Sequence, residues 1–249
     1  MLSACTARRG RAGDPVGRAQ RNGELEGTPA ISEVIGPVPV SQPGGGDLAS
    51  HPDRIRWNAR YAAGPAGSFA PHPAAVRALA MELPDGPVLE LACGPSGSAL
   101  LAAEAGRPVT AVDVSEVALA LLEDEARRRR LGGLITLVQA DLTSWCPPDD
   151  GYALVLCTGY WEYAAFAAGT GAVAAGGLLA WEAFTAEARR VRAGLRAQWC
   201  LGPGEPATLL PARFAVLSQE DIDGGSRGAR RRLLARERAV RGASPLPGW

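Results

Sequence analysis

The sequence contains no lysine, so arginine supplies all 26 of its basic residues. Because the chain is also rich in alanine, glycine and proline, we interpret this bias as GC-rich coding rather than selection for guanidinium chemistry. Clusters of arginine are therefore weak indicators of function in this chain. The 26 acidic residues bring the formal net charge to zero, so no bulk field draws the chain to nucleic acid or to an anionic membrane.

Metal-binding residues are scarce and scattered. There are two histidines, His51 and His72, and five cysteines without any Cys-x-x-Cys spacing, which argues against a zinc site and against a disulfide scaffold. No stretch approaches the roughly 18 consecutive apolar residues of a membrane span. We therefore expect a cytoplasmic protein with no metal, no membrane partner and no nucleic-acid partner, present as a monomer or a homodimer.

The chain is long enough for one large α/β domain. Hydrophobic residues make up 47% of its 249 residues, enough for a sizeable core. Residues 1–47 are rich in glycine, proline, arginine and serine, which predicts a disordered N-terminal arm. The folded domain is expected over residues 48–240, followed by a flexible tail at 241–249.

Short apolar runs alternate with helical segments after residue 51, a pattern typical of βαβ units around a parallel sheet. Strands are predicted at 87–91, 109–113, 135–140, 152–157 and 178–183. Helices are predicted at 98–105, from a cap at Ser115 to a stop at Gly132, at 162–168, and in the arginine-bearing stretch 189–196. Further on, 214–218 and 231–238 predict an antiparallel pair of strands, although the propensities of 231–238 suit a polar helix equally well.

Acidic residues and glycines gather where the first predicted strands end. Glu90 opens a turn that carries Gly94 and Gly97, before a helix whose N-terminus offers free N–H groups. Asp113 and Asp141 close the next two strands, at the edge where parallel sheets bind their ligands. The three-glycine fingerprint of dinucleotide sites is incomplete here, so an ordinary structural turn is the alternative. Three acids in successive loops favour a nucleotide-type cofactor site.

Five segments together resemble the class I S-adenosylmethionine-dependent methyltransferases: 88–94, 110–115, 139–145, 154–157 and 176–179. The first of them departs from the family pattern, because Ala92 and Ser96 stand where glycine is usual. The resemblance implies a Rossmann-like α/β fold, with a seven-stranded, mostly parallel sheet, helices on both faces and a C-terminal antiparallel β-hairpin. It also implies that S-adenosyl-L-methionine is the cofactor, with Asp113 on the ribose and Asp141 near the adenine.

The stretch 56–61 is similar to the opening segment of small-molecule methyltransferases of the tellurite-resistance and thiopurine type. In that branch, the residues at Trp57 and Tyr61 lie across the methionine end of the cofactor. The cofactor-binding residues implied by the resemblance are Trp57, Tyr61, Glu90, Ala92, Gly94, Gly97, Asp113, Val114, Asp141, Leu142 and Cys157.

The acceptor pocket has four candidate residues. The aromatic residues Tyr160, Trp161 and Trp199 could exclude water and favour a sulfonium cation, with ordinary core packing as the alternative for each. His72 could act as a base, although a loop histidine without a catalytic role is favoured over that reading.

We predict methyl transfer to a sulfur, oxygen, nitrogen or tellurium atom of a small molecule, which is the expected partner. Cys157-Thr158-Gly159-Tyr160 stands where amino-methylating nucleic-acid enzymes carry an Asn-Pro-Pro-Tyr-like motif. Two alternatives stay open: a nicotinamide-dependent oxidoreductase, and a module that binds S-adenosylmethionine without catalysis.

Overall fold

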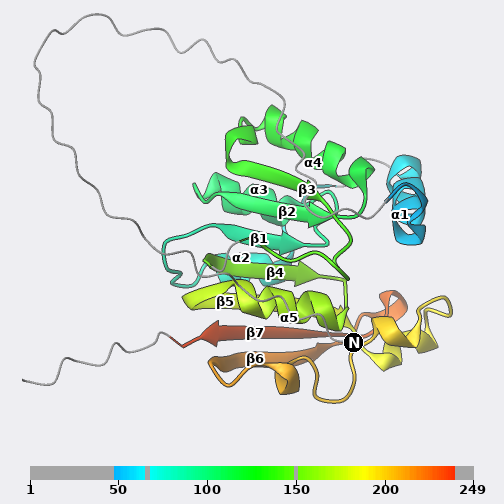
Figure 1. Ribbon diagram of the computed structural model, residues 1–249. Helices are drawn as coiled ribbons and strands as arrows, with labels where there is room; N and C mark the ends of the chain where they lie inside the picture. Colours follow the sequence, from blue (N-terminus) through cyan, green and yellow to red (C-terminus); the bar gives the residue numbers. More distant parts are fainter. Residues whose placement is uncertain (1–47, 65–67, 149–150, 239–249) are drawn as a thin grey trace, which may run out of the picture. The chain divides into compact units, whose positions relative to one another are not determined.

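The computed structural model describes residues 48–64, 68–148 and 151–238. They contain a seven-stranded sheet with the order β3-β2-β1-β4-β5-β7-β6 (Figure 1). The strands are β1 (Val88–Leu91), β2 (Val109–Asp113), β3 (Ile135–Gln139), β4 (Tyr152–Thr158), β5 (Val173–Phe184), β6 (Phe214–Ile222) and β7 (Arg230–Glu237). The predicted arm at 1–47 and the tail at 241–249 lie outside the described residues.

The first five strands pair in parallel, and β7 pairs antiparallel with both β5 and β6. The predicted fold class is thereby confirmed, including the C-terminal antiparallel hairpin. The strand reading of 231–238 is correct, because Leu233, Leu234 and Ala235 are all buried. A polar helix would expose most of these side chains, whereas a strand between two others buries both of its faces.

Helices cover the two faces of the sheet unequally. Buried side chains of α2, α3 and α4 form one core with one face, and those of α5 form a second core with the other. The α-helices are α1 (Pro52–Ala63), α2 (Pro73–Leu79), α3 (Gly97–Glu104), α4 (Glu116–Arg128) and α5 (Tyr163–Ala172). Among the described residues, none of the helices is long and apolar enough to cross a bilayer.

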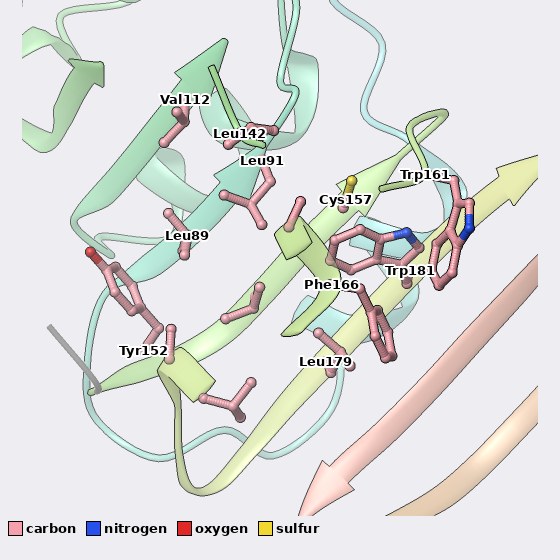
Figure 2. Close-up of a cluster of buried hydrophobic side chains, with 14 of the residues drawn as sticks. Leu89, Leu91, Val112, Leu142, Tyr152, Cys157, Trp161, Phe166, Leu179 and Trp181 are labelled. Atoms are coloured by element: carbon pink, nitrogen blue, oxygen red, sulfur yellow. The ribbon is translucent and has the colours of Figure 1, made fainter. Parts of the chain in front are cut away.

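The core on the α5 face is built around aromatic rings. Trp161, Phe166 and Trp181 gather there (Figure 2), with ring centroids 5.1–6.3 Å apart. Their edge-on and tilted geometry is the preferred one for aromatic pairs. Trp181 is fully buried, and its indole N–H donates to the Tyr160 carbonyl at 3.1 Å. This bond ties the loop after β4 to β5.

The helix predicted at 189–196 is wrong. The structure has the short 3-10 helix η3 (Ala186–Arg190) instead, followed by turns. Ala188 is the only buried residue of η3, so the segment lacks the apolar stripe that stabilises a longer helix. A backbone hydrogen bond connects the two ends of this segment, because the Leu201 N–H donates to the Phe184 carbonyl at 2.8 Å.

The strand order places a topological switch point between β1 and β4. The chain runs outward from β1 through β2 to β3, then returns to β4 on the other side of β1. The loops that leave β1 and β4 therefore diverge at their carboxyl ends, where open α/β sheets bind their ligands. The acids found in the sequence lie at this edge.

Candidate functional site

The turn after β1 is organised around a buried carboxyl group. Glu90 is 2% exposed, and burial raises its pKa to about 8. The Ser96 hydroxyl donates to Glu90 Oε2 at 2.7 Å. The same hydroxyl oxygen accepts from the N–H groups of Ser98 and Ala99, both at 3.0 Å. Ser96 therefore caps α3 and links the helix to the strand.

The backbone of this turn leaves little room for side chains. Ala92 and Gly94 both have left-handed φ angles, +50° and +57°. A Cβ atom at Gly94 would lie 2.9 Å from the Tyr61 hydroxyl, and one at Gly97 would lie 2.1 Å from the Phe69 carbonyl oxygen. Glycine is thus required at Gly97, where a Cβ atom would meet backbone, whereas at Gly94 it would meet the end of the Tyr61 side chain. Ala92 occupies a conformation that glycine adopts more easily.

Asp113 lies directly beside this turn. The Gly94 N–H donates to Asp113 Oδ2 at 2.8 Å, and the Ser115 N–H donates to Oδ1 at 2.9 Å. The side chain is nearly buried, and burial raises its pKa despite these hydrogen bonds. Each carboxylate oxygen has two acceptor positions, so both oxygens can still accept from a ligand hydroxyl.

Helix α1 lies across the same edge of the sheet. Its Asn58 accepts from the Ser115 hydroxyl at 2.6 Å, and its Arg54 forms an ion pair with Glu116 on α4. Tyr61 stacks on Trp57 with the ring centroids 5.6 Å apart. Burial, followed by the nearby Asp113, raises the pKa of Tyr61. The structure thus brings Trp57 and Tyr61 to the glycine turn.

The loop after β3 is built by Asp141. Asp141 Oδ1 accepts from the Thr143 N–H at 2.9 Å, and its Oδ2 accepts from the Thr143 hydroxyl at 2.6 Å. His51, which caps α1, approaches Oδ2 at 3.5 Å. Leu142 is buried in the core on the α5 face, and the Val114 carbonyl accepts from the Gln139 side chain at 3.2 Å.

The three aromatic pocket candidates have different surroundings in the structure. Trp161 belongs to the hydrophobic core, and Tyr160 packs against that core from the edge of the sheet. Cys157 is fully buried at the end of β4, where its thiol donates to the Tyr160 carbonyl at 3.7 Å. Trp199 lies in η4 (Ala197–Trp199) and contacts α1 through Arg56.

His72 caps α2, and both of its ring nitrogens have partners. Nδ1 accepts from the Ala74 N–H at 3.1 Å, so the neutral ring carries its proton on Nε2. That nitrogen lies 3.3 Å from Glu182 Oε1, a carboxylate that is 2% exposed. Arg232 and Arg230 pair with the same carboxylate at 2.7 and 3.6 Å. This geometry leaves His72 no free lone pair with which to act as a base.

Several residues of the site have no local signal in the sequence. Asn58 and Arg54 meet partners 57 and 62 positions away, and Glu182 meets residues from two other segments. Ser96 could have been recognised as a helix cap from its place before α3. No group of three or more His, Cys, Asp or Glu residues within the described ranges could hold a metal ion.

Residues 88–175 match a protein-family model described as a methyltransferase domain. Among curated proteins, no significantly similar sequence was found.

The fold is also found in other solved structures, including the following three. The first structure comes from work on the conversion of a disulfide bond into a thioacetal group during echinomycin biosynthesis. It is 21% identical to this chain with a TM-score of 0.52, and the match covers 75% of this chain and 94% of that chain. Geranyl diphosphate C-methyltransferase from Streptomyces coelicolor, in complex with Mg²⁺, geranyl-S-thiolodiphosphate and S-adenosyl-L-homocysteine, is 14% identical with a TM-score of 0.53, covering 66% and 73%. TehB from Haemophilus influenzae is 17% identical with a TM-score of 0.55, covering 67% and 62%.

Proposed function

We propose that this chain, which has the domain and the fold of the class I S-adenosylmethionine-dependent methyltransferases, transfers a methyl group to a heteroatom of a small molecule. The heteroatom is sulfur, oxygen, nitrogen or tellurium. One observation carries the proposal: Glu90 and Asp113, two buried carboxyl groups, flank the Gly94 turn at the carboxyl ends of adjacent strands.

The residues of this turn fit the chemistry of S-adenosylmethionine. A buried carboxyl group such as Glu90 requires a cationic partner when it ionises, and the cofactor offers an α-ammonium group. Asp113 retains acceptor positions for the two ribose hydroxyls. Gly94 has no side chain between its backbone and the Tyr61 hydroxyl, so Tyr61 lies directly against the turn that would hold the methionine end.

Each residue of the site has a binding or positioning role in this proposal. Glu90, Ala92, Gly94 and Gly97 hold the methionine end, with Trp57 and Tyr61 lying across it. Asp113 and Val114 bind the ribose, while Asp141, Leu142 and Cys157 surround the adenine and the adjoining edge of the sheet. Tyr160 borders the acceptor.

When bound, S-adenosylmethionine supplies a methyl group activated on a sulfonium sulfur. The chain has to align the acceptor in line with that methyl group and exclude water, which can suffice without a general base. Both ring nitrogens of His72 already have partners, which is consistent with a mechanism that needs no general base. Tyr160, whose pKa is raised by burial, stays protonated and contributes a hydroxyl rather than a charge.

Calorimetry tests the cofactor assignment. The wild-type protein should bind S-adenosylmethionine, and Asp113→Asn should weaken binding by about 10- to 100-fold, because hydrogen bonds to a charged acceptor are worth about 1.5–3 kcal/mol. Asp124→Asn on the exposed face of α4 is the matched control and should leave the affinity unchanged. No binding at millimolar cofactor would refute the proposal.

Turnover separates the proposed enzyme from its alternatives. Thiols, phenols, amines and tellurite should be screened by mass spectrometry for methylated products. A thermal shift with a nicotinamide cofactor and none with S-adenosylmethionine would support the oxidoreductase instead, although the hairpin of β6 and β7 argues against it. Cofactor binding without any product would leave the non-catalytic module as the better assignment.

A further inference from the structure

A continuous stack of aromatic rings and guanidinium groups joins α1 to η4. The Arg56 guanidinium lies over the Trp57 ring at 5.1 Å and over the Trp199 ring at 4.6 Å. Arg60 contacts Trp57 at 5.7 Å, and Arg196 contacts Trp199 at 4.9 Å. Arginine stacks on aromatic rings through its planar face. The stack therefore fixes three guanidinium groups while leaving their in-plane N–H donors available.

These guanidinium groups outnumber the carboxylates that pair with them. Asp53 pairs with Arg56 at 3.2 Å. Within the described residues, Arg60 and Arg196 have no carboxylate within ion-pair distance. The stack thus carries an excess of positive charge, in a geometry that matches the planar, two-oxygen face of a carboxylate, phosphate or sulfonate.

The stack joins the proposed cofactor turn to the segment that follows β5. On one side, Trp57 stacks on Tyr61, whose hydroxyl lies against the Gly94 turn. On the other side, Arg56 joins α1 to Trp199 in η4, which belongs to the segment after β5. Helix α1 and the segment after β5 lie at the same end of the sheet (Figure 1).

We propose that the methyl acceptor carries an oxyanion group and that Arg56 and Arg196, held against Trp199, bind this group. The inference rests on the proposed function and adds a substrate class to it. Binding through the in-plane donors orients the acceptor relative to the cofactor turn. The aromatic rings keep the guanidinium groups in place, so little side-chain entropy is lost when the acceptor binds.

A pair of thiols that differ in charge tests the subsite. 4-Mercaptobenzoate and 4-mercaptobenzamide have nearly the same shape, and only the first carries an oxyanion group. The wild-type kcat/KM should be about 10- to 100-fold higher for the benzoate, the value of one charge-assisted contact. Arg56→Gln and Arg196→Gln should each remove most of that preference, measured in each variant as the ratio of kcat/KM for the benzoate to kcat/KM for the benzamide. Arg56→Lys should restore part of it, because lysine keeps the charge but not the planar fork.

Arg192→Gln is the matched control. Arg192 belongs to the same segment and also lies over an aromatic ring, that of Phe184 at 4.8 Å, but it is not part of the stack on Trp199. Its replacement should leave the preference for the benzoate unchanged. An equal loss in Arg192→Gln would mean general electrostatic attraction and would overturn the subsite, as would equal kcat/KM values for the two thiols in the wild type.

Binding can be measured independently of turnover. Fluorine NMR of 4-fluorobenzoate and 4-fluorobenzamide, with and without S-adenosylhomocysteine, should show tighter binding of the benzoate that is lost in Arg56→Gln. Equal or absent binding of both probes would overturn the inference even if neither thiol is methylated. Failure of S-adenosylhomocysteine to bind refutes the proposed function instead, and the comparison on the cofactor-free protein still tests the subsite.

Discussion

Replacing Glu90 by glutamine removes a carboxyl group that the fold buries almost completely. Glutamine has nearly the same shape, and its side-chain carbonyl can still accept from the Ser96 hydroxyl that now donates to Glu90. The substitution therefore preserves the cap of α3 and changes mainly the ability of this position to ionise. We expect it to stabilise the cofactor-free protein and to weaken cofactor binding.

The size of the stability effect follows from the pKa of Glu90, which burial raises from 4.5 to about 8. A difference of this size corresponds to about 5 kcal/mol between the two protonation states. The folded protein keeps the proton over a pH range in which the unfolded chain has lost it. The stability that this proton contributes is therefore fully present below pH 4.5 and is lost as the pH rises to about 8.

Urea denaturation at pH 5, 7 and 9 measures this effect. Relative to wild type, Glu90→Gln should gain free energy of unfolding as the pH rises, by about 4 kcal/mol between pH 5 and pH 9. Glu82→Gln is a matched control, because Glu82 is exposed, and it should follow the wild-type curve. Parallel curves for Glu90→Gln and wild type would refute the reasoning.

Three further substitutions test the local geometry. Gly97→Ala should cost about 3 kcal/mol or more, because its Cβ would meet the Phe69 backbone at 2.1 Å; a loss below about 1 kcal/mol in urea denaturation would contradict the geometry. Ala92→Gly should stabilise the protein by up to about 1 kcal/mol, because φ is +50° there; a lower urea midpoint would argue against strain. Glu182→Ala should lower the free energy of unfolding by about 3–5 kcal/mol, because it leaves Arg232 without its buried partner. In thermal denaturation, the double variant with Arg232→Met should recover part of this loss.

The parallel half of the fold was predictable because its strands are short apolar runs that end at turns. The strand β5 shows where this reasoning stops. It begins at Val173 rather than at 178, because Gly176 and Gly177 indicate a turn in the sequence but lie within an irregular strand. The stretch 189–196 has helix-forming alanine and arginine, yet without an apolar stripe it does not form an α-helix.

The candidate site was predictable in outline. Acids at the ends of the strands and glycines in the turn after β1 are local features, and the structure brings them to one edge. The left-handed conformation of Ala92 shows in the sequence only through the family pattern, in which glycine is usual at this position. The contact between Asn58 and Ser115 leaves no trace in a local pattern, because the two segments meet only after folding. The binding roles of these residues stay predictions.

The position of β7 between β5 and β6 has a consequence during synthesis. β5 ends at Phe184, but its antiparallel partner is complete only at Glu237. At about 5–20 residues per second, the ribosome leaves the hydrophobic edge of β5 without its neighbour for several seconds. A chain that stalls or is truncated in this interval would present that edge to other nascent chains. The last strand in the described part of the chain, β7, thus protects the interior of the sheet from aggregation.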